Sequence, residues 1–214
     1  MMILNLVYNK LSDTYKDLQK GNSPDLNTLK NNFSELITNV SFIKDSMKDV
    51  QILFPSTKHR AKTVNVKDIL DKVNQIYKNT LNENNIFVNI YTSSDSSLEV
   101  KTRDAVLFQT FINLFDNAIY WLKTVDEVRK IEIEIDGNNQ RLVFSDSGPG
   151  IRDDIKNYIF EPFFSGKGED GRGLGLYIAK QLLDRYDYNI DLADTERDRH
   201  LKGANFVLDF SKKE

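Results

Sequence analysis

The sequence predicts an α+β protein: a two-layer α/β sandwich preceded by an antiparallel helical hairpin. After residue 63, amphipathic helical stretches alternate with short segments in which apolar and polar residues alternate, as helices beside a sheet require. Before residue 56, apolar residues instead recur at alternating spacings of three and four, which is typical of helices packed side by side. We therefore expect a helical hairpin at residues 1–55, a linker at 56–63 and a larger domain at 64–214.

The second helix of the hairpin is predicted by apolar residues that follow a single heptad seam: Leu26, Leu29, Phe33, Leu36, Val40, Ile43, Met47, Val50 and Phe54. Pro24 suits the first helical position and Pro55 stops the helix, because proline disfavours a helical residue before it. A shorter upstream stretch keeps the same spacing. A seam this narrow favours self-association, so that two hairpins form a four-helix bundle in a homodimer. The alternative is a hairpin that packs only onto its own domain.

The larger domain is predicted to contain helices and strands in alternation. The expected helices lie at residues 68–81, 103–122 and 174–186, and the expected strands at 64–66, 86–91, 131–135, 141–145, 189–193 and 204–210. The two central strands are joined by a short Asp-Gly-Asn-Asn turn and read as a β-hairpin with one polar and one buried face. Such an arrangement favours a largely antiparallel or mixed sheet covered by helices.

The composition excludes several classes of function. A net charge of −3 over 214 residues gives no reason to expect nucleic acid as a partner. The absence of cysteine excludes a disulfide framework and a thiolate zinc site, and fits a reducing compartment. Apolar runs fall short of the roughly 20 residues that span a bilayer, and no signal peptide is recognisable at the start. We expect a cytoplasmic protein with no membrane segment in this chain, or a soluble piece of a larger protein.

Two asparagines lie four residues apart in the long predicted helix. Asn113 and Asn117 therefore share one helix face, and asparagine is a mediocre helix former, so two on one face of a packed helix need a reason. Amide oxygens suit Mg²⁺, which takes few protein ligands when phosphates supply the others. The alternative is two solvated asparagines on an outer face.

An acidic residue followed by two glycines ends one of the central strands. Asp146 is placed to accept a hydrogen bond from an exocyclic amine such as that of adenine. Gly148 and Gly150 permit positive φ and a close approach of the backbone to a ligand. The alternative is a glycine-rich turn that binds nothing.

A loop with five glycines between residues 166 and 175 leads into a predicted helix. The helix N-terminus offers unpaired N–H groups and a positive dipole end, which suits phosphate, and Lys167 adds a point charge. The spacing is not that of a Walker loop, which needs Gly-Lys-Ser/Thr at the helix start, and it is no convincing dinucleotide fingerprint.

Together these three segments, in this order, resemble the ATP-binding domain of the GHKL superfamily, which contains gyrase, Hsp90, sensor histidine kinases and MutL. The resemblance covers residues 64–210, is closest to the histidine-kinase branch with its N, G1, F and G2 boxes, and implies the Bergerat α/β sandwich. It implies ATP or ADP with Mg²⁺ as ligands. The hairpin similarly resembles the dimerisation and phosphotransfer hairpin that precedes this domain in sensor kinases.

The resemblance also implies a role for each matching residue. Asn117 is the expected magnesium ligand, and Asn113 a catalytic partner on the phosphate side that is also a possible magnesium ligand. Asp146 is expected to hold the adenine amine. The remaining expected contacts are the adenine-pocket residues Gly148, Gly150 and Ile151 and the phosphate-covering residues Lys167, Gly171, Gly173, Leu174 and Gly175, with Lys167 also a catalytic candidate. Tyr120 departs from the family, since many members carry a lysine there.

Asn113 bears on the fate of the phosphate. In the hydrolysing members, the residue four before the magnesium asparagine is a glutamate that activates water, and an amide cannot accept a proton. We therefore expect phosphoryl transfer or simple nucleotide binding rather than rapid hydrolysis.

The phosphoacceptor of the family, a histidine followed by an acidic residue on the first hairpin helix, has no match here. Only His59 and His200 are present, and we expect both to be ordinary surface histidines. Either the acceptor lies upstream of Met1 and this chain is a piece of a longer kinase, inactive alone, or the full protein lacks an acceptor.

The leading hypothesis is thus the Mg-ATP-binding catalytic portion of a dimeric histidine kinase-like protein, which transfers phosphoryl to a histidine outside this chain and pairs with a phosphoacceptor domain or response regulator. One alternative is a nucleotide-gated dimerisation module of a larger GHKL conformational ATPase, MORC-like or of the defence type, with slow or no hydrolysis by itself. A weaker one is a nucleotide-binding pseudokinase that acts as a scaffold.

Overall fold

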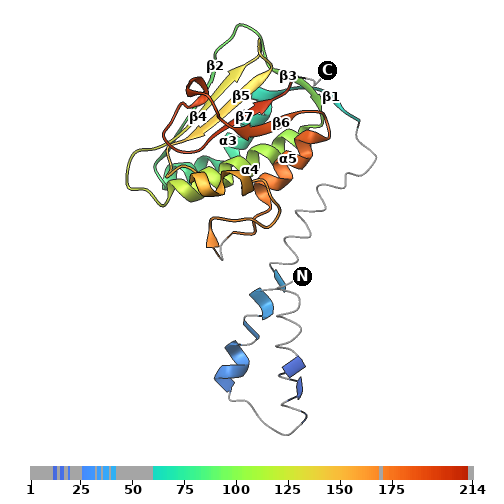
Figure 1. Cartoon of the computed structure of the whole chain (residues 1–214), viewed down its shortest axis with the longest axis vertical. Helices are drawn as coiled ribbons and strands as arrows, with labels where there is room; N and C mark the ends of the chain where they lie inside the picture. Colours follow the sequence, from blue (N-terminus) through green and yellow to red (C-terminus); the bar gives the residue numbers. More distant parts are fainter. Residues whose placement is uncertain are drawn as a thin grey trace. The chain divides into compact units, whose positions relative to one another are not determined.

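The computed structural model describes residues 12–13, 15–16, 19, 26–31, 33–34, 36–38, 40–41, 60–168 and 171–211 (Figure 1). The chain divides into two compact units, Met1–Ile52 and Leu53–Glu214. In the first unit, every described residue is helical, as the heptad seam requires. The expected hairpin turn near Pro24, the seam beyond residue 41 and most of the linker lie outside the described residues, so the hairpin stays a prediction.

The second unit has the predicted α+β architecture. Its helices are α3 (Val66–Glu83), α4 (Asp104–Leu122) and α5 (Gly175–Asp184), with 3₁₀ turns η1 (Asp153–Tyr158) and η3 (Glu196–Asp198). Its strands are β1 (Lys62–Asn65), β2 (Ile86–Thr92), β3 (Glu99–Thr102), β4 (Arg129–Asp136), β5 (Arg141–Asp146), β6 (Asn189–Leu192) and β7 (Asn205–Asp209). Five strands form one mixed sheet in the order β2-β4-β5-β7-β6, in which only β2 and β4 run parallel. The expected mixed sheet is confirmed.

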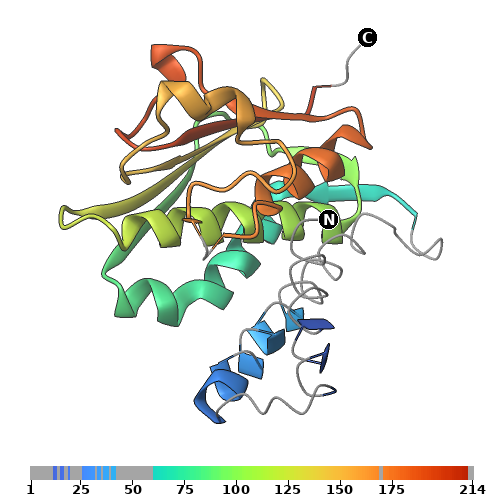
Figure 2. The same ribbon diagram turned by 60° about the horizontal axis from the view of Figure 1, so that its bottom comes forward.

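The three helices cover one face of this sheet (Figures 1 and 2). The isoleucines of β4, Ile131, Ile133 and Ile135, are at most 1% exposed and point toward α4, whose Phe111 and Phe115 are fully buried. Asn65 caps α3, because its side-chain oxygen accepts hydrogen bonds from the first-turn backbone. The helix that carries both asparagines, α4, therefore packs directly on the buried face of the sheet.

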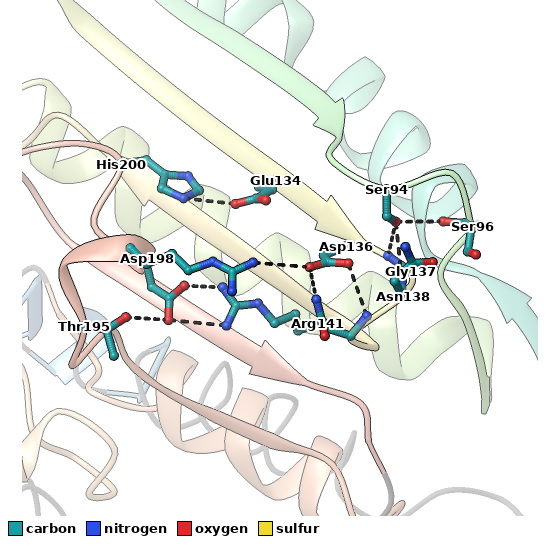
Figure 3. A network of polar contacts seen from close by, with 12 residues as sticks. Ser94, Ser96, Glu134, Asp136, Gly137, Asn138, Arg141, Thr195, Asp198 and His200 are labelled. Carbon is teal, nitrogen blue, oxygen red and sulfur yellow. Dashed lines mark hydrogen bonds and ion pairs between the residues drawn. The ribbon is translucent and has the colours of Figure 1, made fainter.

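The opposite face of the sheet is not as polar as the sequence suggests. Val143 and Ser145 of β5 point away from the helices, yet they are 1% and 0% exposed. The β6–β7 loop (residues 193–204) lies against this outer face, where it forms ion pairs with β4 and β5 (Figure 3). The expectation of one polar and one buried face is wrong for β5, because a loop distant in sequence covers the face that alternation alone would leave in water.

The structure also contains a strand pair that the sequence did not suggest as a pair. β1 begins at Lys62, two residues before the expected strand, and pairs antiparallel with β3, which was not expected at all. β3 spans only four residues, too few for its alternation to stand out. Within the described part of the chain, no helix is both long and apolar enough to cross a membrane.

Candidate functional site

The predicted magnesium ligand Asn117 meets the glycine-rich loop. Lys167 donates a hydrogen bond from Nζ to Asn117 Oδ1 at 2.7 Å, and the same Nζ lies 4.6 Å from the centroid of the Tyr120 ring. Burial lowers the pKa of the Lys167 amine, and the negative charge of Asp116 partly opposes this. Residues 50 positions apart in the sequence are thus in contact, and the amide oxygen of Asn117 faces a cation.

Asn113 lies one turn earlier, beside the start of α5. Its Oδ1 accepts a hydrogen bond from Gln109 at 3.3 Å, whereas its Nδ2 is buried and has no partner among the described residues. A Cβ on Gly175 would lie 3.7 Å from the Asn113 side chain, so the first residue of α5 faces it. No side chain among the described residues caps α5, so the N–H groups of its first turn have no cap there. The Asn113 amide and the first N–H groups of α5 are thus hydrogen-bond donors that lie close together, which suits the binding of an anion.

Asp146 is a buried carboxylate held by the backbone. The residue is 4% exposed, and its Oδ1 accepts hydrogen bonds from the N–H of Gly148 at 2.8 Å and of Ala204 at 3.2 Å. Burial raises the pKa of the carboxyl from 3.8 to about 6, although these two hydrogen bonds lower it. Both bonds end on Oδ1, so Oδ2 is the oxygen that remains for a ligand.

Glycines bring the backbone close around this carboxylate. A Cβ on Gly148 would lie 2.9 Å from Asp146 Oδ1, and one on Gly203 would lie 2.3 Å from it. Gly150 has φ +78°, which side-chain-bearing residues rarely adopt. Gly148 and Gly203 therefore both lie against the Asp146 carboxylate, and sequence reasoning missed Gly203. Its signal was weak: a single glycine just before the last strand.

The glycine-rich loop packs against the preceding segment. Gly173 has φ +65°, and a Cβ there would lie 2.5 Å from the Phe163 backbone, whose N–H donates to the Gly173 carbonyl. A Cβ on Gly171 would overlap the hydroxyl of Ser165. Both glycines are thus required by close packing, and Leu174, 2% exposed, begins the turn into α5. Residues 169–170 lie outside the described part.

Trp121 links the two ends of the candidate site. A Cβ on Gly148 would lie 3.4 Å from Trp121 Cβ, and one on Gly166 would lie 3.4 Å from its ring. Tyr120 contacts this ring edge-on. The structure therefore brings together the α4 asparagines, the Asp146 turn and the loop around Lys167. Neither aromatic residue was assigned a role from sequence, because their contacts are made across the fold.

One sequence interpretation is wrong. The His200 side chain is only 12% exposed, and its Nε2 lies 3.0 Å from Oε2 of Glu134 on β4, so it is not a surface histidine. His59 lies outside the described residues. A separate cavity of about 550 Å³ borders Gly150 and Ile151 on the side of the β6–β7 loop, and neither Asn117 nor Asp146 lines it.

The site residues fit a magnesium nucleotide. In the described ranges, no three His, Cys, Asp or Glu side chains converge as a metal site. A metal at Asn117 would therefore need oxygens from a ligand, as Mg²⁺ bound to phosphates provides. The orphaned Asn113 amide and the uncapped α5 offer donors for phosphate, and Asp146 offers an acceptor for an amine.

Comparison with known proteins identifies a family of ATPases. Residues 102–214 match the family described as histidine kinase-, DNA gyrase B-, and HSP90-like ATPase. Sporulation kinase A of Bacillus subtilis (strain 168) is 31% identical over 154 residues, which are 70% of this chain and 24% of that protein. The chain thus spans about a quarter of this relative's length.

Solved structures of histidine kinases share the fold. The catalytic domain of histidine kinase ThkA superposes with a TM-score of 0.59 at 26% identity, covering 72% of this chain and 97% of that one. ThkA in complex with the response regulator TrrA gives a TM-score of 0.61 over 99% of this chain and 60% of that chain. At 22% identity, this second likeness shows the fold alone.

Proposed function

This chain belongs to the family of histidine kinase-, DNA gyrase B-, and HSP90-like ATPases, in its sensor histidine kinase branch, and we propose that it binds Mg-ATP and transfers the γ-phosphoryl group to a histidine outside the chain. The observation that carries the proposal is the buried Asp146 carboxylate, which has one oxygen fixed by backbone N–H groups. A charge kept at 4% exposure with no cationic partner in the described part of the chain costs stability, and a bound amine donor offsets that cost.

The base of the nucleotide is assigned to the Asp146 end. Oδ2 accepts the hydrogen bond of the exocyclic amine of adenine, while Gly148, Gly150 and Ile151 form the adjoining wall. A guanine base presents a carbonyl at the position of that amine, which repels the carboxylate. The site is therefore expected to prefer adenine nucleotides.

The magnesium end is assigned to Asn117. Its Oδ1 already accepts a hydrogen bond from the Lys167 ammonium, so this oxygen can face a positive charge. Mg²⁺ bound at Asn117 would supply charge neutralisation for the phosphates, and the Lys167 ammonium would then be available to pair with a phosphate oxygen. ADP binds at the same site with one phosphate fewer.

The phosphates are assigned to the start of α5. Gly173, Leu174 and Gly175 present backbone N–H groups, and Asn113 adds an Nδ2 donor that has no partner among the described residues. The N–H of Gly171 already donates to the Gly168 carbonyl at 3.3 Å, so Gly171 serves the packing of the loop rather than the phosphates. The Nδ2 donor suits a phosphate oxygen better than a metal, so we favour the phosphate-side role of Asn113 over magnesium ligation. These groups hold and orient the γ-phosphate, which is most of what phosphoryl transfer needs.

Transfer is favoured over hydrolysis by the chemistry of Asn113. Its amide has no proton-accepting group, and its oxygen is already engaged by Gln109. Water near the γ-phosphate is therefore not activated from this position. The acceptor histidine is assigned to another segment or protein, and a response regulator is the partner expected downstream.

A homodimer through the N-terminal helices is supported by exposed apolar residues. Leu26, Phe33 and Val40 are spaced by seven and are 67%, 56% and 55% exposed, whereas Leu36 is 9% exposed. A heptad row of exposed apolar residues is the pattern that a partner helix covers. We propose that a second copy of the chain covers this row of apolar residues. We also propose that the protein lies in the cytoplasm.

Incubation of the full-length gene product with γ-labelled Mg-ATP tests the proposal. We expect an acid-labile, alkali-stable phosphoprotein that is lost in Asn117→Ala. Steady phosphate release without labelled protein, again abolished by Asn117→Ala, would instead identify a conformational ATPase. Binding of ATP with neither product would identify the scaffold.

A further inference from the structure

We propose that His200 and Glu134, on the outer face of the sheet, are positioning residues for adenine binding, because they anchor the β6–β7 loop, whose last residues Gly203 and Ala204 form the wall beside the Asp146 carboxylate. This inference rests on the proposed function, and it names residues that do not touch the nucleotide.

The first anchor is the His200–Glu134 pair (Figure 3). Nε2 of His200 lies 3.0 Å from Oε2 of Glu134, and the two side chains are 12% and 14% exposed. An N–H on Nε2 donates to the carboxylate in the imidazolium and in one neutral tautomer. Glu134 projects from β4 away from the helices, since its neighbours Ile133 and Ile135 face them. The ion pair thus attaches the loop to β4, an inner strand of the sheet.

The second anchor lies two residues before His200 in the same loop. Asp198, whose side chain is 7% exposed, pairs with Arg141 of β5 and accepts a hydrogen bond from Thr195 at 3.0 Å (Figure 3). Burial raises the pKa of the Asp198 carboxyl, but the hydrogen bonds from Arg141 and Thr195 outweigh it and the pKa is lowered overall. This carboxylate therefore stays ionised and holds its end of the loop to β5.

An asparagine transmits the position of His200 to the wall. Asn205 Oδ1 accepts hydrogen bonds from the N–H of His200 at 3.0 Å and of Leu201 at 3.3 Å. Its Nδ2 donates to the carbonyls of Leu201 at 2.9 Å and Gly203 at 3.0 Å. Because Asn205 is 7% exposed and begins β7, the backbone from His200 to Gly203 is fixed to the sheet.

The wall in turn fixes Asp146. The N–H of Gly203 donates to the Asp146 carbonyl at 3.0 Å, and the N–H of Asp146 donates to the Ala204 carbonyl at 2.9 Å. The N–H of Ala204 reaches Asp146 Oδ1 at 3.2 Å. A Cβ on Gly203 would lie 2.3 Å from that oxygen, so the Gly203 backbone packs tightly against the carboxylate. A shift of the loop therefore turns the carboxylate that receives the adenine amine.

The anchors act on one end of the nucleotide only. The outer face of β4 and the phosphate-side residues of α4 lie on opposite sides of the sheet. Hydrogen bonds connect His200 to the site through Asn205 and the Gly203–Ala204 wall, at the Asp146 end. Loosening the loop is therefore expected to weaken binding of ATP, ADP and adenosine by the same factor. Damage at the phosphate end would instead grow with the number of phosphates.

The test compares three substitutions in the full chain. His200→Leu removes the donor to Glu134, and His200→Gln keeps one. Arg199→Ala alters a neighbour whose ion pair in the described part of the chain is with Glu196 of the same loop, at 3.3 Å, and not with the sheet. Titrations of ATP, ADP and adenosine are followed by the fluorescence of Trp121, the single tryptophan of the chain. We expect His200→Leu to weaken all three ligands about five- to tenfold. His200→Gln is expected to restore most of the affinity, and Arg199→Ala to leave it unchanged.

A second measurement needs no nucleotide. Amide hydrogen exchange of Gly203 and Ala204 is expected to be faster in His200→Leu than in the wild type, with the core of β5 unchanged. If His200→Leu does not fold, His200→Asn, too short to reach Glu134, takes its place.

Four results would overturn the inference. They are unchanged exchange at Gly203 and Ala204, unchanged affinity in His200→Leu, a loss confined to ATP, or a loss as large in His200→Gln as in His200→Leu. Failure of the wild type to bind any of the three ligands would refute the proposed function. The exchange comparison would then still decide whether His200 positions the wall.

Discussion

Asp146→Asn is expected to make the protein more stable while it loses its nucleotide. Asparagine keeps the acceptor oxygen that receives the N–H groups of Gly148 and Ala204, but it never ionises. Its Nδ2 replaces the oxygen assigned to the adenine amine, so two donors face each other. We expect ATP affinity to fall by about 10- to 100-fold.

The gain in stability follows from the pKa of the buried carboxyl. Burial raises this pKa from 3.8 to about 6 in the folded protein. At about 1.36 kcal/mol per pKa unit, ionisation destabilises the folded state by about 3 kcal/mol. The penalty is absent below the unfolded pKa, grows as pH rises from about 4 to about 6 and is complete above, because the unfolded chain releases its proton first. At pH 8, Asp146→Asn is therefore expected to unfold with a free energy up to about 3 kcal/mol larger than that of the wild type.

Urea unfolding followed by Trp121 fluorescence at pH 8 and at pH 4 measures this difference. The expected result is a higher midpoint for Asp146→Asn at pH 8 and a much smaller difference at pH 4. Contributions from other carboxyls, such as the lowered pKa of Asp198, cancel because both proteins share them. A variant that is less stable at pH 8, or a difference that does not vary with pH, would refute the reasoning.

Three other changes test parts of the site. Lowering the pH below about 6 is expected to weaken ATP binding up to tenfold per unit, because the protonated Asp146 no longer attracts the adenine amine; calorimetry at pH 5 and pH 8 measures this, and equal affinities would contradict it. Gly203→Ala places a Cβ 2.3 Å from Asp146 Oδ1, so we expect a loss of about 1–3 kcal/mol in unfolding free energy together with weaker ATP binding. Unchanged unfolding free energy and unchanged ATP affinity would show that the Gly203–Ala204 wall moves aside without disturbing Asp146. Asn113→Glu supplies a general base beside the assigned phosphate site, so steady-state phosphate release is expected to rise, whereas unchanged release would remove Asn113 from the argument against hydrolysis.

The residues of the candidate site could be predicted from the sequence, because each group of them lies within a short continuous segment of the chain. Asn113 and Asn117 share a helix face at any position in a fold, and the glycines after Asp146 mark a tight turn wherever it lies. The positions of the helices, and of every strand except β3, also followed from periodicity, with ends that differ by a few residues. These features depend on neighbours in the chain, which the sequence shows directly.

Contacts between distant segments could not be predicted in the same way. Lys167 on Asn117, and Gly203 with Ala204 on Asp146, join residues 50 or more positions apart. The burial of His200 was not predicted, because the residues of its own loop do not reveal that Glu134 lies opposite it on the outer face of β4. The same long-range packing buries the face of β5 that alternation assigned to water. The sequence pattern specifies each element, whereas the sheet order decides which elements meet.

Calorimetric titration of ATP into the wild-type chain and into Asn117→Ala, each with and without Mg²⁺, decides whether Asn117 holds the magnesium of a bound nucleotide. We expect one nucleotide bound per chain, tighter binding when Mg²⁺ is present, and loss of that magnesium effect in Asn117→Ala. Adenosine, which has no phosphate, is predicted to bind the variant and the wild type equally. Binding of Mg-ATP by Asn117→Ala with unchanged affinity and unchanged magnesium dependence would contradict the account.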